Sequence, residues 1–411
     1  MKKFSHFMGA MAAGLAACLI FTDTMDTRAE GKTELLPDKP KQAGTTLEDP
    51  EETKAPSEDI EQPEVTSEDI ESPEVTSGNS GPSYDDIHGI YVSAHVAGTK
   101  SIMDEIIEHI DETGINAVVI DVKTDEGTIA FDMDSELIDG LGVEDILVKD
   151  MPGLMDTLHE HGVYTIARCV AFRDPFIDEV KPEWMLKNAD GSIYEDAKGF
   201  NWINPGAQEA REYLVEVAKG CRAAGFDEVQ YDYVRFPTGI KEEDIGINGY
   251  GRRRAVYEFV KYAYFNLQKE DIPLSLDVFG TIIGSTVDSN IVGQDYSWLS
   301  MDCDYLSPMI YPSHYYEGSF GLTNPDLYPY ETIDGAMKDS ATALKVVNPK
   351  GTRKQAKVRP WLQGFTASYL SKYRTYGAEE VKEQIRALND NGIYSWIIWN
   401  PSCKYQWEAF K

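Results

Sequence analysis

The chain has 411 residues, of which 42% are hydrophobic, and a formal net charge of −32 at pH 7. This length predicts either two or three modules or one large barrel with tails, and the concentration of nearly all aromatic residues after residue 83 favours the barrel. The acidity repels phosphate backbones and anionic lipid surfaces, and no basic patch offsets it, so we expect no nucleic acid partner and favour a neutral or cationic one.

The N-terminal residues 1–29 have the pattern of a secretory signal. Two lysines in MKKFSH precede an apolar run of about 15 residues, which is too short for a comfortable membrane-spanning helix. Leu15-Ala16-Ala17-Cys18 is similar to a bacterial lipobox, whereas Thr27-Arg28-Ala29 suits ordinary signal cleavage, and both routes stay open. Either route predicts an extracytoplasmic protein, secreted or anchored at the cell envelope, that contacts a membrane only through this segment.

Residues 30–83 form an acidic segment with 15 acidic and 4 basic side chains and no aromatic residue. Too little apolar surface is present to offset chain entropy, so we expect a disordered linker. A ten-residue unit occurs twice, as SEDIEQPEVT at 57–66 and SEDIESPEVT at 67–76. Proline and like charges extend such a chain, which predicts a spacer between the envelope and the next module; a tail without a role is the alternative.

Short apolar runs that favour strands recur eight times in residues 84–411, at 88–95, 117–123, 163–170, 227–236, 273–280, 304–312, 359–365 and 394–401. Amphipathic helical patterns lie between them, among them 101–114, 151–162, 205–225, 252–269 and 377–392. Several end at a glycine, which predicts left-handed caps at Gly114, Gly162, Gly225 and Gly392. Eight alternating units predict an α/β protein with a (β/α)8 TIM barrel. A doubly wound sheet would need a glycine-rich turn after its first strand, and none is present.

Three aspartates lie near the carboxyl ends of predicted strands, where TIM barrels carry their chemistry. They are Asp121, Asp232 and Asp277, and a buried aspartate is costly unless it is paired or hydrogen-bonded. Glycosidic cleavage needs two carboxyl groups across a cleft, one to attack or to activate water and one to protonate the leaving oxygen. We therefore expect all three aspartates to be catalytic, with Asp232 and Asp277 on neighbouring strands.

Charged and polar side chains accompany these aspartates. Strand alternation places Lys123 on the same face as Asp121, and Gln230 on the same face as Asp232. We expect Lys123, Arg168 and Arg235 to hold one carboxyl group ionised by charge pairing while a less paired one keeps its proton. The structural alternative is a buried ion network that only ties the barrel, such as Asp232 with Arg235 or Asp121 with Lys123.

The long segment from Arg173 to Pro205 follows the third predicted strand, and long loops in compact domains commonly form lids or binding walls. Aromatic rings and amide side chains gather on the same predicted face, and sugars stack on rings and hydrogen-bond to amides. We expect the substrate to contact Lys123, Arg168, Trp202, Asn204, Gln230, Arg235, Tyr311, His314, Gln363, Trp396, Trp399 and Asn400. For any single ring, a place in the barrel core is the alternative.

Histidines and cysteines show no metal or nucleophile motif. No HExxH, GxSxG or CxxC pattern is present, so we expect neither a metal nor another cofactor. Cys169, Cys221, Cys303 and Cys403 are widely spaced; we expect buried free thiols, with disulfides as the alternative.

Several motifs together resemble a bacterial family of TIM-barrel glycoside hydrolases that is catalogued as a domain of unknown function. They are AVVIDVKTDEG, ARCVAFRDPF with a downstream NWINP, FDEVQYDYVRFP, LSLDVFG and SPMIYPSHY, and the resemblance spans roughly residues 86–408. It implies a (β/α)8 fold that acts on a polysaccharide. A similarity to amylase-like enzymes implies that Asp232 is the nucleophile. Those enzymes place a glutamate acid on the next strand, where this chain has Asp277; Asp125, Glu126 or Glu317 are the alternatives for the acid.

The sequence thus predicts an exported glycoside hydrolase, a monomer without cofactors, that acts on a cell-wall or extracellular polysaccharide or oligosaccharide. A non-catalytic glycan-binding protein on the same scaffold is the main alternative, and transglycosylation is a third.

Overall fold

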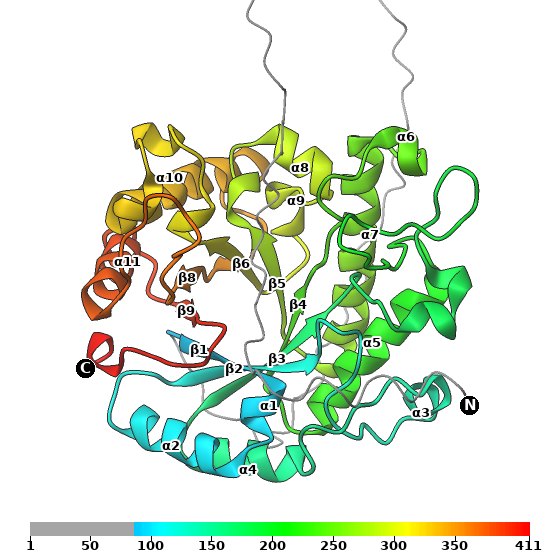
Figure 1. The fold of residues 1–411 in the computed structure, drawn as a ribbon, viewed down its shortest axis with the longest axis horizontal. Helices are drawn as coiled ribbons and strands as arrows, with labels where there is room; N and C mark the ends of the chain where they lie inside the picture. The colour runs from blue at the N-terminus through cyan, green and yellow to red at the C-terminus, as the bar shows by residue number, and fades with distance from the viewer. Residues whose placement is uncertain (1–85) are drawn as a thin grey trace, which may run out of the picture. The chain divides into compact units, whose positions relative to one another are not determined.

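The computed structural model describes residues 86–411, and the predicted signal and linker lie outside the described residues. A closed parallel barrel forms the centre of this part of the chain (Figure 1). Its hydrogen-bonded order is β1-β2-β3-β4-β5-β6-β8-β9 and back to β1, with β7 at the edge of β6. Because β7 and β8 are consecutive and both pair with β6, they are two pieces of one barrel strand. The predicted (β/α)8 TIM barrel is confirmed, and the strands are β1 (His88–Val92), β2 (Ala117–Lys123), β3 (Tyr164–Val170), β4 (Glu228–Asp232), β5 (Leu274–Phe279), β6 (Tyr305–Ile310), β7 (Lys357–Val358), β8 (Trp361–Gln363) and β9 (Trp396–Trp399).

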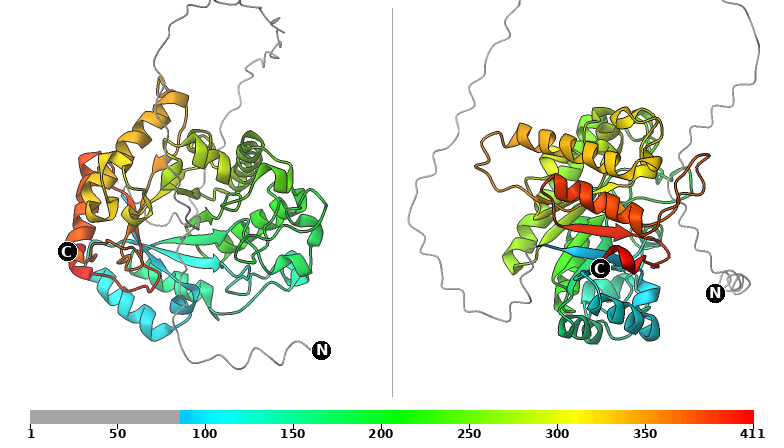
Figure 2. Two further views of the ribbon diagram at one scale, coloured as in Figure 1. Left: turned by 45° about the horizontal axis from the view of Figure 1, so that its top comes forward. Right: turned by 90° about the vertical axis from the view of Figure 1, so that its left-hand side faces the viewer.

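Helices surround the barrel (Figures 1 and 2). Helix α2 buries Met103, Ile106, Ile107 and Ile110, the spacing that places one face of a helix against the strands. None of the described helices is long and apolar enough to cross a membrane. The helices are α1 (Ala94–Ala97), α2 (Lys100–Asp111), α3 (Glu136–Leu141), α4 (Met151–Glu160), α5 (Gln208–Ala223), α6 (Glu242–Ile245), α7 (Gly249–Leu267), α8 (Thr286–Val292), α9 (Tyr296–Leu299), α10 (Pro329–Val347) and α11 (Ala378–Asp390).

Strand alternation divides the core into two layers. On β2, Val118 and Ile120 pack outward in the large cluster beneath the helices, whereas Val119 belongs to a smaller cluster inside the barrel. That inner cluster includes Tyr91 and Trp361. Residues with the parity of Val119 therefore point into the barrel, and Asp121 is one of them.

The amino ends of the strands are sealed by a buried ion pair. Glu228 accepts hydrogen bonds from both terminal nitrogens of Arg359, and neither side chain is exposed. Tyr164 donates to Glu228 at 3.2 Å. Both carboxylate oxygens of Glu228 are thus paired inside this end of the barrel, which leaves the carboxyl ends for chemistry with a soluble molecule.

Three of the four predicted glycine caps are confirmed. Gly162, Gly225 and Gly392 have φ values of 71°, 104° and 72°, in the left-handed region that favours glycine. The prediction is wrong for Gly114, whose φ is not positive. Its backbone N–H donates to the Phe410 carbonyl at 2.9 Å, and a Cβ atom there would lie 3.2 Å from the same oxygen, so a close approach of the C-terminal segment favours glycine.

Cys169, Cys221, Cys303 and Cys403 are free thiols in the described part of the chain, and all four are buried. The sulfur atoms of Cys169 and Cys221 lie 3.8 Å apart, between β3 and α5.

Candidate active site

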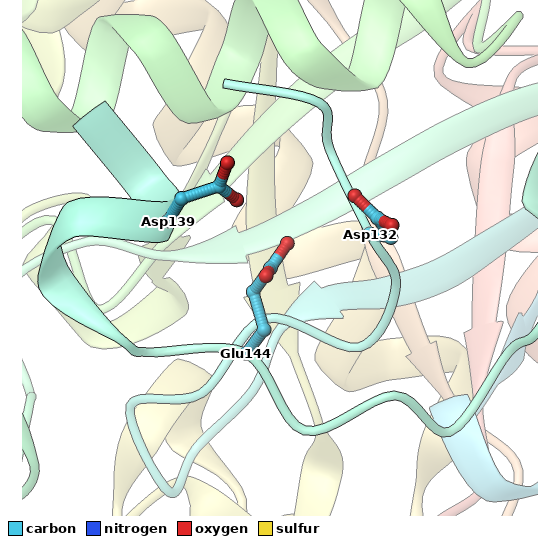
Figure 3. Close-up of side chains that lie close together, drawn as sticks. All are labelled: Asp132, Asp139 and Glu144. Carbon is cyan, nitrogen blue, oxygen red and sulfur yellow. The ribbon is translucent and has the colours of Figure 1, made fainter. Parts of the chain in front are cut away.

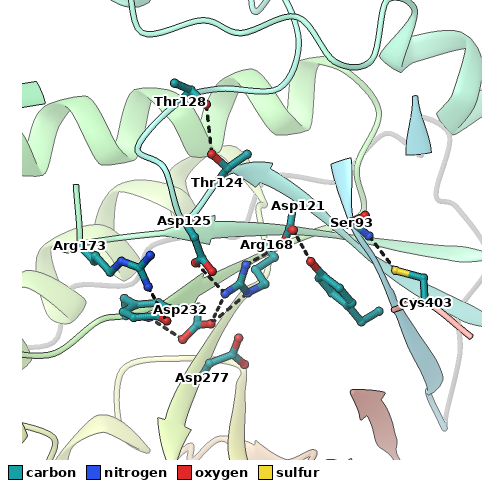
Figure 4. Close-up of polar contacts among 12 residues, drawn as sticks. Ser93, Asp121, Thr124, Asp125, Thr128, Arg168, Arg173, Asp232, Asp277 and Cys403 are labelled. Atoms are coloured by element: carbon teal, nitrogen blue, oxygen red, sulfur yellow. Dashed lines mark hydrogen bonds and ion pairs between the residues drawn. The ribbon is translucent and has the colours of Figure 1, made fainter. Parts of the chain in front are cut away.

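The three predicted aspartates meet inside the barrel at the carboxyl ends of the strands. The register pairs Asp121 on β2 with Arg168 on β3, and Tyr231 on β4 with Leu276 on β5. The residues that follow this second pair are Asp232 and Asp277, which therefore lie at one level on neighbouring strands. Figure 4 shows the group, with Arg168 among Asp121, Asp125 and Asp232 and with Asp277 beside Asp232.

The Arg168 guanidinium binds three carboxylates. Its Nε and Nη2 atoms donate to Asp232 Oδ2 at 3.0 and 2.6 Å, and its Nη1 atom donates to Asp121 Oδ1 at 2.7 Å. A longer contact of 3.3 Å joins Nη2 to Asp125. Burial alone would lower the pKa of Arg168, but the carboxylates reverse this and raise its pKa well above the ordinary value. The guanidinium is thus a fixed cation that sets the positions of the carboxylates around it.

Asp232 has donors on both oxygens. Besides the two bonds from Arg168, its Oδ1 atom accepts the backbone N–H of Tyr233 at 2.6 Å. Tyr233 has φ of 49°, which is unusual for a residue with a bulky side chain and marks local backbone strain. The strain occurs where it directs this N–H at Asp232, whose side chain stays 11% exposed. Asp232 is accordingly held rigidly and is reachable from solvent.

Asp277 lies in a drier environment. Its Oδ1 atom accepts a hydrogen bond of 2.6 Å from the indole nitrogen of Trp361, and the residue is only 1% exposed. Burial, followed by the negative charge of Asp232, raises the pKa of Asp277 well above its ordinary value. Two neighbouring carboxyl groups thus have opposite surroundings, one among cationic and N–H donors and the other in a largely apolar setting.

Asp121 is tied to β1 as well as to Arg168. The Tyr91 hydroxyl donates a short hydrogen bond to its Oδ2 atom. Burial raises the pKa of Asp121 above its ordinary value, and Arg168 opposes the effect. Trp399, at the end of β9, covers this corner, with its ring centroid 4.1 Å from that of Tyr91 and 5.6 Å from Cζ of Arg168.

Further aromatic groups line the opposite side, after β6 and β8. Tyr311 packs edge-on against Phe365 at 5.8 Å and against His314 at 5.1 Å. Burial lowers the pKa of His314 to about 4, so this ring is neutral at neutral pH. Trp399 thus lies beside Arg168, Tyr311 lies near Asp277 and Asp232, and His314 packs against Tyr311; their contact with a substrate stays a prediction.

Arg235 is near Asp232 but is not its hydrogen-bonding partner. Its guanidinium lies over the rings of Trp202, Tyr233 and Phe279 at 5.1, 4.9 and 4.6 Å. Burial lowers the pKa of Arg235 to about 10, which leaves a cation at neutral pH. The ion pair of Asp232 is formed with Arg168, and not with Arg235 as in the structural alternative.

The prediction that Lys123 lies beside Asp121 is wrong. A β-bulge between the two residues shifts the register of β2, so that Lys123 pairs with Cys169 in the outer layer. Its ammonium group forms an ion pair of 2.8 Å with Asp174, and neither side chain is exposed. Lys123 therefore cannot contact a substrate in this structure.

Trp396 is also misplaced by the sequence prediction. It is the first residue of β9, where it stacks on His88 at 4.7 Å and on Phe410 at 5.8 Å in the outer layer. This position is at the opposite end of the strand from Asp232, so Trp396 does not belong to the cluster of aromatic residues at the site.

The remaining predicted contact residues are occupied by internal hydrogen bonds. Gln230 donates to Ser307, Gln363 donates to Asp326, and both are fully buried. Trp202 is 2% exposed and donates to Asp196. The half-buried Asn204 accepts the backbone N–H of Gly206 in a turn, and the half-buried Asn400 donates to the Gly364 carbonyl, which joins the ends of β8 and β9. These groups shape the walls, and in this conformation they offer little to a ligand.

Two site residues were missed by the sequence analysis, Tyr91 and Trp361. Both have the inward parity of their strands, in HGIYVSAH and RPWLQGF. The alternation of side-chain directions was applied only to the charged and amide residues of the predicted strands. Applying it to the tyrosine and tryptophan residues of the eight strands as well would have found them.

One group of carboxylates in the described residues has the geometry for a metal ion. Asp132, Asp139 and Glu144 bring oxygen atoms within 4.8 Å of one another, in the segment after β2 (Figure 3). Such oxygen ligands suit a hard cation. Two of the three residues are exposed, however, and exposed acidic groups commonly gather without an ion, so we assign no metal to them.

Comparison with known proteins places the chain in a family. A family model described as "Putative glycosyl hydrolase domain" matches residues 89–405. A search of curated proteins gives no match.

Two similar solved structures share the barrel fold. The "PgaB (BpsB) glycoside hydrolase domain" from Bordetella bronchiseptica has 12% identity and a TM-score of 0.58, over 79% of this chain and 99% of that one. The C-terminal domain of a "putative chitinase" from Desulfitobacterium hafniense DCB-2 has 14% identity and a TM-score of 0.50, over 79% and 97%. A hypothetical protein from Ruminiclostridium thermocellum ATCC 27405 has 28% identity and a TM-score of 0.41, over 46% and 97%.

Proposed function

Because the chain belongs to this family of glycosyl hydrolase domains, we propose that it hydrolyses glycosidic bonds in a cell-wall or extracellular polysaccharide. The observation that carries the proposal is the pair Asp232 and Asp277 on neighbouring strand ends in opposite environments. A glycosidase usually has two carboxyl groups whose surroundings favour the protonated form of one and the ionised form of the other.

Asp232 is the nucleophile or general base. It accepts three N–H donors, two of them from a cation, and such donors suit a negatively charged oxygen. Asp277 is the proton carrier, because burial and the nearby negative charge favour its neutral form. Asp121 acts through Arg168, whose position it fixes from the other side.

Neighbouring strands lie about 5 Å apart, which favours the short carboxyl separation of retaining glycosidases. In that reaction Asp232 attacks the anomeric carbon while the bond to the leaving oxygen breaks and Asp277 gives its proton to that oxygen. Water then attacks the same carbon, loses a proton to Asp277 and releases Asp232. The half-buried Trp399, beside Tyr91 and Arg168, offers a ring on which a sugar stacks near the aspartates.

A non-catalytic glycan-binding protein is the second candidate, and one observation favours it. Asp277 is only 1% exposed, and a working acid must reach the leaving oxygen. The half-buried Asp125, at the mouth of the barrel, is the alternative proton carrier. Export to the cell envelope through the N-terminal signal, with the acidic linker as a spacer, stays part of the proposal.

The test compares the wild-type protein with Asp232→Asn on a panel of cell-wall and extracellular polysaccharides, measured by release of new reducing ends. We expect cleavage of at least one polysaccharide by the wild type and a loss of about 10³-fold in the variant, with an unchanged circular dichroism spectrum. Asp156→Asn, on the exposed side of α4, is the matched control and should keep full activity. Retention of a glycan without any product would support the binding protein, and products extended by added acceptor sugars would reveal transglycosylation.

A further inference from the structure

We propose that Trp361 is a positioning residue that fixes which oxygen of Asp277 carries the catalytic proton. The inference rests on the proposed function, since it concerns the group that we assign as proton carrier. The observation behind it is the hydrogen bond of 2.6 Å from the indole nitrogen of Trp361 to Asp277 Oδ1.

The chemistry of the two groups sets the direction of this bond. An indole nitrogen only donates, so Oδ1 must accept whatever the protonation state of Asp277. In a neutral carboxyl group the carbonyl oxygen is the better acceptor, and the hydroxyl oxygen carries the proton. The bond from Trp361 therefore makes Oδ1 the carbonyl oxygen and leaves the proton on Oδ2.

Packing holds the indole in this position. Trp361 is 1% exposed, and its strand β8 is paired with β6 on one side and β9 on the other. Its ring meets that of Trp399 edge-on at 5.7 Å. The donor is thus fixed by the barrel itself and does not depend on a substrate.

Four other groups act on Asp277 from other parts of the barrel. Asp232 on β4 and the buried Tyr311 after β6 lie close to it, while Arg168 on β3 and Arg359 before β8 are the nearby cations. Burial and Asp232 favour the neutral acid, whereas the Trp361 bond and the two arginines favour the charged form. Trp361 thus limits how far the pKa of Asp277 is raised, besides choosing its oxygen.

The test uses the full chain with Trp361→Phe, which keeps a ring of similar shape and removes the donor. If Asp277 is the acid, activity falls as pH rises through its pKa, so the alkaline limb of the pH–rate profile should move up by about 1 to 2 pH units. We expect kcat to fall about tenfold with KM nearly unchanged, because the proton is no longer confined to Oδ2. Trp407→Phe, which makes the same exchange of indole for phenyl at a ring stacked on His109 at 4.6 Å, is the matched control and should leave the profile in place.

Infrared spectroscopy tests the inference without any activity. The carbonyl band of neutral Asp277, identified by its loss in Asp277→Asn, should titrate at higher pH in Trp361→Phe than in the wild type. If Trp361→Phe does not fold, the indole ¹⁵N–¹H resonances of the wild type test the inference instead. The chemical shift of one of them must follow the titration of Asp277, and this resonance must shift in Asp277→Asn. Equal titration of the band in both proteins, or no responding indole resonance, overturns the proposal. Absence of hydrolysis by the wild type would overturn the proposed function and leave these spectroscopic results standing.

Discussion

Replacing Asp277 by asparagine should abolish hydrolysis and yet stabilise the protein as pH rises. The amide keeps an Oδ1 acceptor for the Trp361 N–H, so no donor loses its partner. In the wild type, burial and Asp232 raise the folded-state pKa of Asp277 well above its ordinary value of 3.8. A raised pKa means that the folded state binds the proton more tightly than the unfolded chain does. The stability from this group is complete below pH 4 and declines as pH rises towards the folded pKa.

The size of the effect follows from proton linkage. Between the unfolded and the folded pKa of one carboxyl group, the free energy of unfolding falls by about 1.4 kcal/mol per pH unit, and Asp277→Asn lacks this loss. The variant should therefore gain about 1.4 kcal/mol on the wild type for each unit above pH 4, until the folded pKa is reached. Urea denaturation of both proteins at pH 5, 6, 7 and 8 measures the difference. A stability difference that does not change with pH would refute the reasoning, because it would mean that the pKa of Asp277 is the same in the folded and unfolded states.

Two further substitutions separate the site from the surrounding frame. Arg168→Met should lower the free energy of unfolding, measured in urea at neutral pH, by about 3–5 kcal/mol, because it leaves buried carboxylates unpaired. Arg168→Lys should recover less than half of this lost stability, since one ammonium group cannot span two carboxylates. An Arg168→Lys variant with full stability and full activity would contradict this reasoning. Lys123→Met should lower the free energy of unfolding by about 3–5 kcal/mol, because it leaves the buried carboxylate of Asp174 without its cation. The values of kcat and KM per folded molecule should stay unchanged. Adding Asp174→Asn should restore most of the stability lost in Lys123→Met, and a change in KM in either variant would return Lys123 to the site.

The sequence predicted the barrel because strands that are buried on both faces appear as short apolar runs, and helices that are buried on one face appear as amphipathic segments between them. All eight predicted strand segments contain barrel strands, and the run 359–365 contains β8. The alternation of side-chain directions along a strand gave the wrong face for Lys123, because a bulge adds one residue to β2 and no glycine or proline in the strand indicates it. A single inserted residue reverses the facing of the side chains that follow it.

The sequence predicted which charged residues lie at the site better than which of them pair with one another. The prediction that Arg168 and Asp232 belong to one charged group relied on strand ends meeting at one face, and the structure brings these residues together. Arg235 is only three residues from Asp232, yet the aromatic rings around it hold it elsewhere. Which cation reaches which carboxylate depends on side-chain length, bulges and ring packing, and local sequence spacing does not encode these properties.

Strand β4 shows why the same chemistry serves two purposes in one barrel. Its inward residues are Glu228, Gln230 and Asp232, with exposures of 0%, 0% and 8%. Glu228 and Asp232 each bind a buried arginine, so a carboxylate–guanidinium pair does not by itself distinguish a structural tie from a reactive group. Two features differ at the upper pair: Asp232 keeps a small exposed fraction whereas Glu228 has none, and a second carboxyl group, Asp277, lies at the same level. Because the lower pair is fully buried and its carboxylate and guanidinium bind each other, the barrel is closed at its amino end, and chemistry is left to the carboxyl end, where Asp232 keeps some exposure.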